Sequence, residues 1–437
     1  FNRFILKELR ARIIGYIFIW SSYLYFMMRN SILGIDWLPT QEERVRNAVI
    51  HILNNSNFVK YGLTSWHQIS PQSDKLLYSV QAHEYLHYAA LMKLGGEKLF
   101  SQIAPHIDKI VVFGLCVACA ELCVNIFDFK SNLSPNVIGI ASFLVFCTLP
   151  YTYRMLLGNW QDVYCLMFLL FSYILFSKGK RKLGIFLMIY AFLWQYHWSI
   201  LFGVFYGFIY IYLAISNQKV SISNLFPPGF RSLDSAKKFL LVFWVSPFIS
   251  LIQSFLLSFN GYTVSNNNLL YRVGIDSPMN IHHGGWLSAL QFLGGNRVNL
   301  CIQPGKAFES ILSTKLSFNI YTFNCLLSIS SMFLISIVSI IAYILLTKSQ
   351  VDKRWILVPF AITFISFTMF FQQALAAHLQ GHSIYFAPIF TIGFISLAFI
   401  IPLLNKNHPV SHILFSIIIS TVVINNIRVS FLTGMNG

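Results

Sequence analysis

Acidic side chains gather at the start of the first long polar stretch, residues 34–109. Asp36 follows directly on an apolar run, and Glu42 and Glu43 come within about two helical turns of it. A carboxylate held within hydrogen-bond reach of a hydroxyl group can act as a general base. We therefore take Asp36 as the first candidate for a catalytic base at a membrane surface, with Glu42 and Glu43 as the next candidates.

Residues 83–87 have the sequence His-Glu-Tyr-Leu-His and match the H-E-x-x-H zinc motif. On a helix, His83 and His87 would share one face and could bind zinc, with Glu84 as the general base. A catalytic zinc site needs a third ligand, and the downstream candidate, Glu121, lies inside an apolar run. The alternative is an interfacial helix that carries these side chains on its polar face, and we prefer it.

Three cysteines, Cys116, Cys119 and Cys123, surround Glu121 at helical spacing. Cysteine packs as a small, polarizable side chain against a neighbouring helix, which explains the spacing without a metal. An ionisable side chain within a membrane span is costly unless it has a partner. We therefore expect a buried partner for Glu121.

Two further turns between apolar runs are polar. Asp162 opens an apolar run just after the first of these turns, where the positive end of a helix dipole favours an acid. His378 and His382 lie four residues apart in the second turn. Such a pair suits contact with a phosphate or hydrogen bonding at the interface, and metal ligation is the alternative.

The composition is that of a polytopic membrane protein. Hydrophobic residues make up 56% of the 437 and charged residues only 11%, and the mean hydropathy is +0.63. The net charge of +16 predicts loops that face an anionic cytoplasmic leaflet. It does not indicate nucleic-acid binding, because the basic residues are scattered among the apolar runs. The seven cysteines have no disulfide pattern.

About eleven apolar runs are long enough to be membrane spans. More than half of the 31 Lys and Arg residues lie in the N-terminal segment and in short loops on one side, which are therefore expected to be cytoplasmic. The basic start also predicts a retained first span rather than a cleaved signal peptide. Segments 34–109 and 259–320 then lie outside. The predicted spans are 12–33, 110–127, 136–153, 162–177, 183–196, 199–215, 239–258, 321–347, 355–373, 383–403 and 410–426.

The first outer segment is expected to contain two amphipathic helices on the membrane surface. Thr40 and Glu43 have the spacing of a capping box, and apolar residues recur at helical spacing after them. In that helix Glu43 would serve the cap and Glu42 would lie on the exposed side. A second helix is predicted over 75–94, ended by Gly95-Gly96. The other outer segment, 259–320, is rich in Asn and Gly and is predicted to be a mobile flap.

The order of these features resembles the GT-C superfamily of integral membrane glycosyltransferases, especially the protein O-mannosyltransferases and lipid A aminoarabinose transferases. The resemblance covers about residues 1–215 and 380–400. It departs from the family pattern in two places. Glu42-Glu43 replaces an Asp-Glu pair, and two prolines are missing after His83. The matching segments are Glu42–Val49, His83–Tyr88, Leu91–Gly96, Asp162, the basic turn Lys178–Lys182 and His382–Pro388.

The resemblance implies an all-α membrane glycosyltransferase that uses a polyprenyl-phosphate-linked sugar donor. The acceptor would be a glycan, a lipid or a protein on the outer side of the plasma (inner) membrane, with the N-terminus in the cytoplasm. Residues 1–258 would form the catalytic module, 259–320 the flap and 321–437 the C-terminal spans. Asp162 would be a ligand for the acceptor or for a divalent metal ion of unspecified identity. The phosphate-binding candidates are Arg154, Arg272, Arg297, His378 and His382.

Three other functions fit parts of the sequence. A membrane zinc protease would use His83, Glu84 and His87. A polysaccharide polymerase or ligase would also use lipid-linked glycans, with its chemistry in segment 259–320. A transporter would need polar residues at mid-membrane and symmetric halves, whereas the polar residues here are concentrated in the loops of one face. The sequence favours the glycosyltransferase.

Overall fold

The computed structural model describes part of the chain. The described residues are 2–29, 39–54, 76–77, 83–127, 133–156, 161–194 and 264–265, with isolated positions over 248–259 and 412–427. Asp36, Arg272, Arg297, His378 and His382 lie outside them, as do five predicted spans in whole or nearly so and almost all of the predicted flap.

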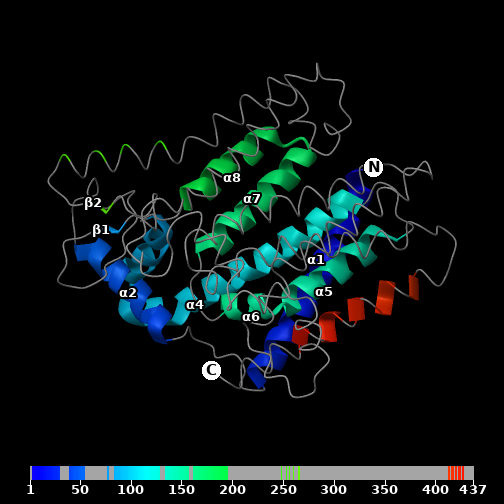
Figure 1. Cartoon of the computed structure of the whole chain (residues 1–437), viewed down its shortest axis with the longest axis horizontal. Coiled ribbons are helices and arrows are strands. Elements are labelled where there is room, and N and C mark those ends of the chain that lie inside the picture. Colours follow the sequence, from blue (N-terminus) through cyan, green and yellow to red (C-terminus); the bar gives the residue numbers. More distant parts are fainter. Residues whose placement is uncertain are drawn as a thin grey trace, which may run out of the picture. The chain divides into compact units, whose positions relative to one another are not determined.

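The described part of the chain is helical, as predicted, apart from one pair of two-residue strands (Figure 1). The strands β1 (Leu76–Leu77) and β2 (Val264–Ser265) pair in parallel. The helices are α1 (Asn2–Arg29), α2 (Pro39–Asn54), α4 (His83–Phe127), α5 (Pro135–Thr148), α6 (Pro150–Leu156), α7 (Gln161–Ser177) and α8 (Arg181–Trp194).

Helix α1 covers residues 12–29 of the first predicted span. Among the described residues, Glu8–Arg29 is the stretch that is long and apolar enough to cross a membrane, and three shorter apolar helices accompany it. The predicted number of eleven spans stays a prediction. One face of α1 is buried and the other is exposed: Ile14 is 67% exposed and Phe18 73%. The buried face repeats at helical spacing and consists of Arg12, Tyr16, Trp20, Tyr23 and Met27.

The chain divides into two compact units. The first consists of Phe1–Leu33, Cys116–Arg154 and Tyr271–Gly437, and in it α1 packs against α5. The second consists of Gly34–Leu115 and Met155–Leu270.

Helix α2 and two arms of α4 form a small core in the second unit. The arms meet at Gly96, whose φ of 68° and ψ of −170° break the helix. Such backbone angles suit a residue without a Cβ atom. The prediction that a helix ends at Gly95-Gly96 is confirmed. Its predicted start at residue 75 is wrong, because α4 begins at His83 and 76–77 form β1. The core side chains are Val45, Ala48, Val49, Tyr85, Tyr88, Ala89, Met92, Phe100 and Ala104.

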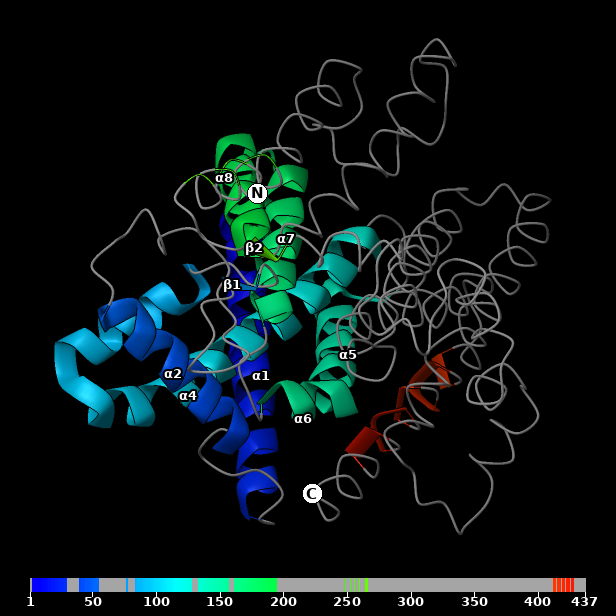
Figure 2. The same ribbon diagram turned by 60° about the vertical axis from the view of Figure 1, so that its left-hand side comes forward.

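Helices α7 and α8 run side by side in the second unit, as Figures 1 and 2 show. The predicted basic turn connects them, and Gly179 takes a φ of 76° there. The Ser172 hydroxyl donates a hydrogen bond of 2.7 Å to the Gly184 carbonyl and ties the two helices together near the turn.

The predicted span 136–153 is divided into α5 and α6. Ser134 caps α5 by accepting a hydrogen bond from the Val137 amide, and Pro135 follows in the first turn. Leu149 ends α5 with a ψ of 135° directly before Pro150. Proline disfavours the helical conformation of the residue before it, so the residues of this predicted span form two helices.

Candidate functional site

Of the two adjacent acids Glu42 and Glu43, Glu42 is the one whose carboxylate is held by hydrogen bonds to other side chains. Its Oε1 accepts hydrogen bonds from Arg46 Nη2 at 2.5 Å and from Ser101 Oγ at 3.2 Å. Arg46 Nη2 also lies 3.3 Å from Ser101 Oγ, so the three polar groups form a closed triangle. Because Ser101 belongs to α4, the triangle ties α2 to the arm of α4 that follows Gly96.

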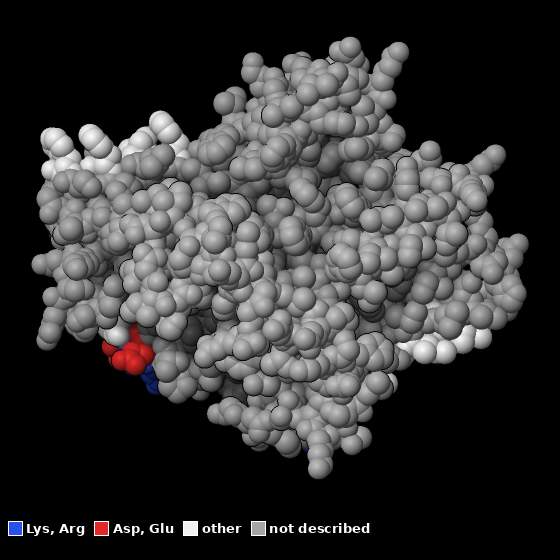
Figure 3. All heavy atoms as spheres, viewed as in Figure 1, with Lys and Arg blue, Asp and Glu red and all other residues white. Residues whose placement is uncertain are grey.

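The predicted positions of Glu42 and Glu43 are both wrong. The Glu42 side chain is only 25% exposed, whereas Glu43 is exposed. Helix α2 begins at Pro39, so Thr40 lies inside its first turn and not at the capping position. Glu43 therefore does not have the capping-box role, and Glu42 is not on the exposed side. On the face shown in Figure 3, described acidic atoms form one small patch with basic atoms beside it, near α2.

A second acid, Asp108, is buried at the meeting point of α4 and α7. It is 3% exposed, and its Oδ1 accepts a hydrogen bond of 2.5 Å from each of the Tyr88 and Tyr164 hydroxyls. The two hydroxyl oxygens are 3.0 Å apart. Burial and the neighbouring Asp108 carboxylate raise the pKa of Tyr88 well above its usual range. The sequence analysis missed this group. Tyr88 and Tyr164 are 20 and 56 positions away from Asp108 along the chain, and no local pattern identifies residues so far apart as partners.

His87 belongs to an aromatic cluster beside the Asp108 group. Its ring centroid lies 3.8 Å from that of Tyr88, 5.8 Å from Tyr164 and 5.6 Å from Trp194, and the last two rings stack at 4.2 Å. Burial lowers the pKa of His87 to about 4. The imidazole is therefore neutral at pH 7, which is also the form that binds metals.

All five residues of the zinc motif, 83–87, lie on one helix, because α4 begins at His83. The side chains of His83 and Glu84 lie outside what the structure describes. Within the described ranges, no group of three or more His, Cys, Asp or Glu side chains is placed to hold a metal ion. Zinc binding by residues 83–87 stays a prediction.

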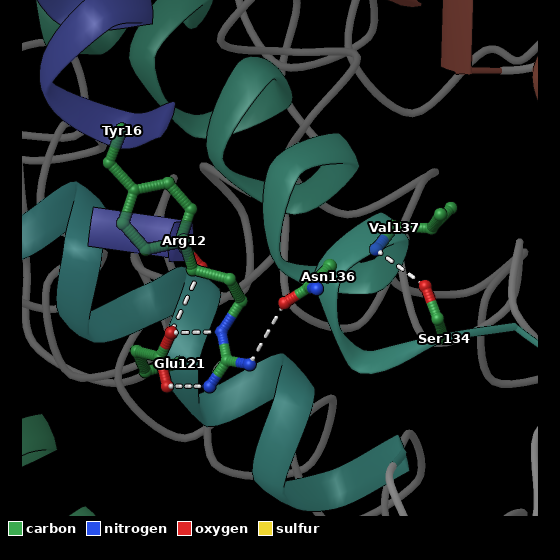
Figure 4. Close-up of polar contacts among 6 residues, drawn as sticks. All are labelled: Arg12, Tyr16, Glu121, Ser134, Asn136 and Val137. Atoms are coloured by element: carbon green, nitrogen blue, oxygen red, sulfur yellow. Dashed lines mark hydrogen bonds and ion pairs between the residues drawn. The ribbon is translucent and has the colours of Figure 1, made fainter. Parts of the chain in front are cut away.

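Glu121 has the buried partner that its position predicted (Figure 4). Arg12 donates from Nε to Oε1 at 2.9 Å and from Nη2 to Oε2 at 3.1 Å, and the Tyr16 hydroxyl donates to Oε1 at 3.0 Å. Arg12 also donates from Nη1 to Asn136 Oδ1 at 3.3 Å. Arg12 belongs to the basic N-terminal segment, and on α1 it is buried as a partner for the glutamate.

Glycine at position 139 makes room for this ion pair. A Cβ atom there would overlap the Tyr16 hydroxyl and lie 2.7 Å from Arg12 Cδ. The three cysteines near Glu121 are buried free thiols.

Two further predicted site residues lie in described helices. Arg154 is in α6 and Asp162 is in the first turn of α7, as expected for an acid at a helix start. Their side chains lie outside the described residues. Of the nine residues in the acid and phosphate sets, the structure therefore describes the side chains of Glu42 and Glu43.

A comparison with known proteins found no matching family model, no matching curated protein and no matching solved structure.

Proposed function

We propose that this chain is a membrane glycosyltransferase that takes a sugar from a polyprenyl-phosphate-linked donor. The observation that carries the proposal is the half-buried triangle of Glu42, Arg46 and Ser101 on the helix that follows the first candidate span. It combines a carboxylate, a cation and a hydroxyl group at a place where a lipid-linked substrate would present its phosphate.

The proposed membrane location is supported by α1. Its exposed apolar face would be unfavourable in water and suits contact with lipid. Residues 30–38 connect α1 to α2, and ten chain steps can span at most about 35 Å. The acids in and before α2 therefore have a short tether to the end of a candidate span.

The proposed chemistry needs a base and a group that stabilises the departing phosphate. Asp36 keeps its place as the first candidate base, because it precedes α2 by three residues on the same tether. Of the two next candidates, Glu42 is preferred to Glu43, because Glu42 is oriented by two partners. Hydrogen bonds from Arg46 and Ser101 fix the direction of its carboxylate, which a positioned base requires.

The proposal is tested by incubating the purified protein in lipid nanodiscs with a panel of polyprenyl-phosphate sugars. The expected result is release of polyprenyl phosphate with at least one donor. Asp36→Asn keeps the shape of the side chain but removes its charge, and it should lower turnover at least about a hundredfold. Glu42→Gln is the second test, and Glu43→Gln is the matched control because Glu43 is exposed. Full activity in both the Asp36 and Glu42 variants would contradict this function for the first outer segment.

A membrane zinc protease is the second candidate, because His83 and His87 lie on one helix and His87 is neutral. Metal analysis of the purified protein separates the two functions. One zinc per chain that is lost in the His83→Ala/His87→Ala variant would favour the protease.

A further inference from the structure

The guanidinium of Arg46 is fixed in place by more than its neighbour on the same helix. Nη2 contacts both Glu42 on α2 and Ser101 on α4, at 2.5 and 3.3 Å. An isolated pair four residues apart on an exposed helix holds an arginine only weakly. The second contact, on another helix, gives the planar group one orientation.

The rest of this guanidinium is left for another partner. The Arg46 side chain is 37% exposed. Among the residues that the structure describes, only Nη2 of Arg46 makes hydrogen bonds, so Nη1 is not engaged. Nε is buried, so an anion would have to approach the guanidinium from its Nη1 side. A guanidinium that is already oriented loses little conformational entropy when an anion binds.

The backbone of Arg46 is equally well anchored. Val45 and Val49 on the same helix are fully buried, and Tyr85 and Tyr88 of α4 are fully buried in the same core. Ser101 lies between Phe100 and Ala104, which belong to the same core. An oriented cation on a packed helix provides a fixed site rather than a flexible surface charge.

We infer that Arg46, positioned by Glu42 and Ser101, binds the phosphate of the lipid-linked substrate. The identity of the ligand in this inference rests on the proposed function, because a glycosyltransferase of this kind would bind a prenyl phosphate beside α2. Arginine suits this task, since its N–H groups bind phosphate oxygens in a directed way. The Glu42 carboxylate and the phosphate would then contact the same guanidinium, so the candidate base and the leaving group would lie close together.

The experiment measures the binding of farnesyl phosphate to the purified protein in detergent, with farnesol and inorganic phosphate as separate ligands. Arg46→Gln should weaken farnesyl phosphate binding at least about tenfold, the effect of one hydrogen bond between charged groups. It should leave farnesol binding unchanged. Arg46→Lys should fall between, because lysine keeps the charge but not the planar fork. Lys93→Gln removes an exposed cation from the same unit and should change nothing.

Further outcomes decide between a ligand contact and a structural role. Equal weakening of farnesol and farnesyl phosphate in Arg46→Gln would overturn the inference, as would unchanged binding of the phosphate. If Arg46→Gln does not fold, Glu42→Gln serves instead. Its amide oxygen can still accept the hydrogen bond that orients Arg46, but it removes the negative charge that competes with a phosphate, so farnesyl phosphate should bind as tightly or more tightly. A tenfold weaker affinity in Glu42→Gln would overturn the inference. Tight binding of inorganic phosphate alone, without a contribution from the prenyl chain, would also overturn it by assigning the site to free phosphate.

The inference and the proposed function fail in different ways. Phosphate-selective binding that depends on Arg46, without sugar transfer from any donor, would contradict the glycosyltransferase and keep the binding site. Sugar transfer with an unchanged KM for the donor in Arg46→Gln would keep the enzyme and reject Arg46 as its phosphate ligand.

Discussion

Arg12 and Glu121 show why a charged residue inside an apolar helix needs a matched partner. Both are almost fully buried, and both oxygens of the carboxylate accept hydrogen bonds from the guanidinium. Removing one member of a buried pair leaves an uncompensated charge, which costs more than the pair itself contributes. The pair therefore joins α1 to the second half of α4 in a way that depends on both residues.

We predict that Arg12→Leu and Glu121→Leu will each destabilise the purified protein by about 3–5 kcal/mol. The double variant should be less destabilised than the sum of the two, because no unpaired charge remains. Thermal unfolding of the four proteins in detergent, followed by tryptophan fluorescence, measures the coupling. Tyr16→Phe is the control, since it removes one hydrogen bond from Glu121 and leaves the ion pair intact. Additive effects of the two leucine variants would show that the pair is not coupled.

At the scale of the element, the break in α4 decides where the second unit has its core. Gly96 turns the chain so that the arm starting at His83 and the arm containing Phe100 both contact α2. Nothing lies within 4 Å of a Cβ atom built at Gly96, so space does not select glycine there. The positive φ does, because side chains with a Cβ atom rarely adopt it together with an extended ψ.

Replacing Gly96 by alanine is expected to cost about 1–3 kcal/mol through backbone strain alone. The strain would loosen the packing of α2 on α4, so limited proteolysis within residues 39–104 should become faster. Gly15→Ala is the matched control, because its Cβ atom would lie 3.6 Å from Ile140, an ordinary contact. The two variants are compared by thermal unfolding. Equal stability of Gly96→Ala and Gly15→Ala would mean that the chain tolerates another conformation at the break.

The whole molecule is expected to place its two long polar segments on the same side of a membrane. The prediction depends on the basic residues of the short loops, and the turn between α7 and α8 is one of these loops. The N-terminal end of α7 and the C-terminal end of α8 then face the same side, and the stacked Tyr164 and Trp194 rings at these ends show that they meet.

Cysteine labelling of whole cells tests this arrangement. In a Cys301→Ser background, cysteines at Ser65 and Ser277 should react with a membrane-impermeant maleimide, and a cysteine at Ser223 should not. Labelling at Ser223 after the cells are permeabilised shows that the site is reactive. Opposite accessibility of Ser65 and Ser277 would contradict the predicted arrangement of eleven spans.

The sequence by itself determined the features that depend on local chemistry. Helical periodicity and apolar content predicted helices over the described part of the chain, and Gly95-Gly96 predicted the break in α4, because glycine is a local signal. The cost of an ionisable group within an apolar run also predicted that Glu121 must have a partner. Each of these conclusions follows from neighbours along the chain.

Only the tertiary structure decided which residues meet. Arg12 pairs with a glutamate 109 residues away, and Asp108 binds tyrosines from two helices. Glu42 faces Ser101, whereas the adjacent Glu43 is exposed; the sequence analysis had placed Glu42 on the exposed side and Glu43 in a capping box. The physical reason is the same in each case. The helix that packs against a given helix determines which of its faces is buried. Two adjacent acids in a sequence do not indicate which helix that will be.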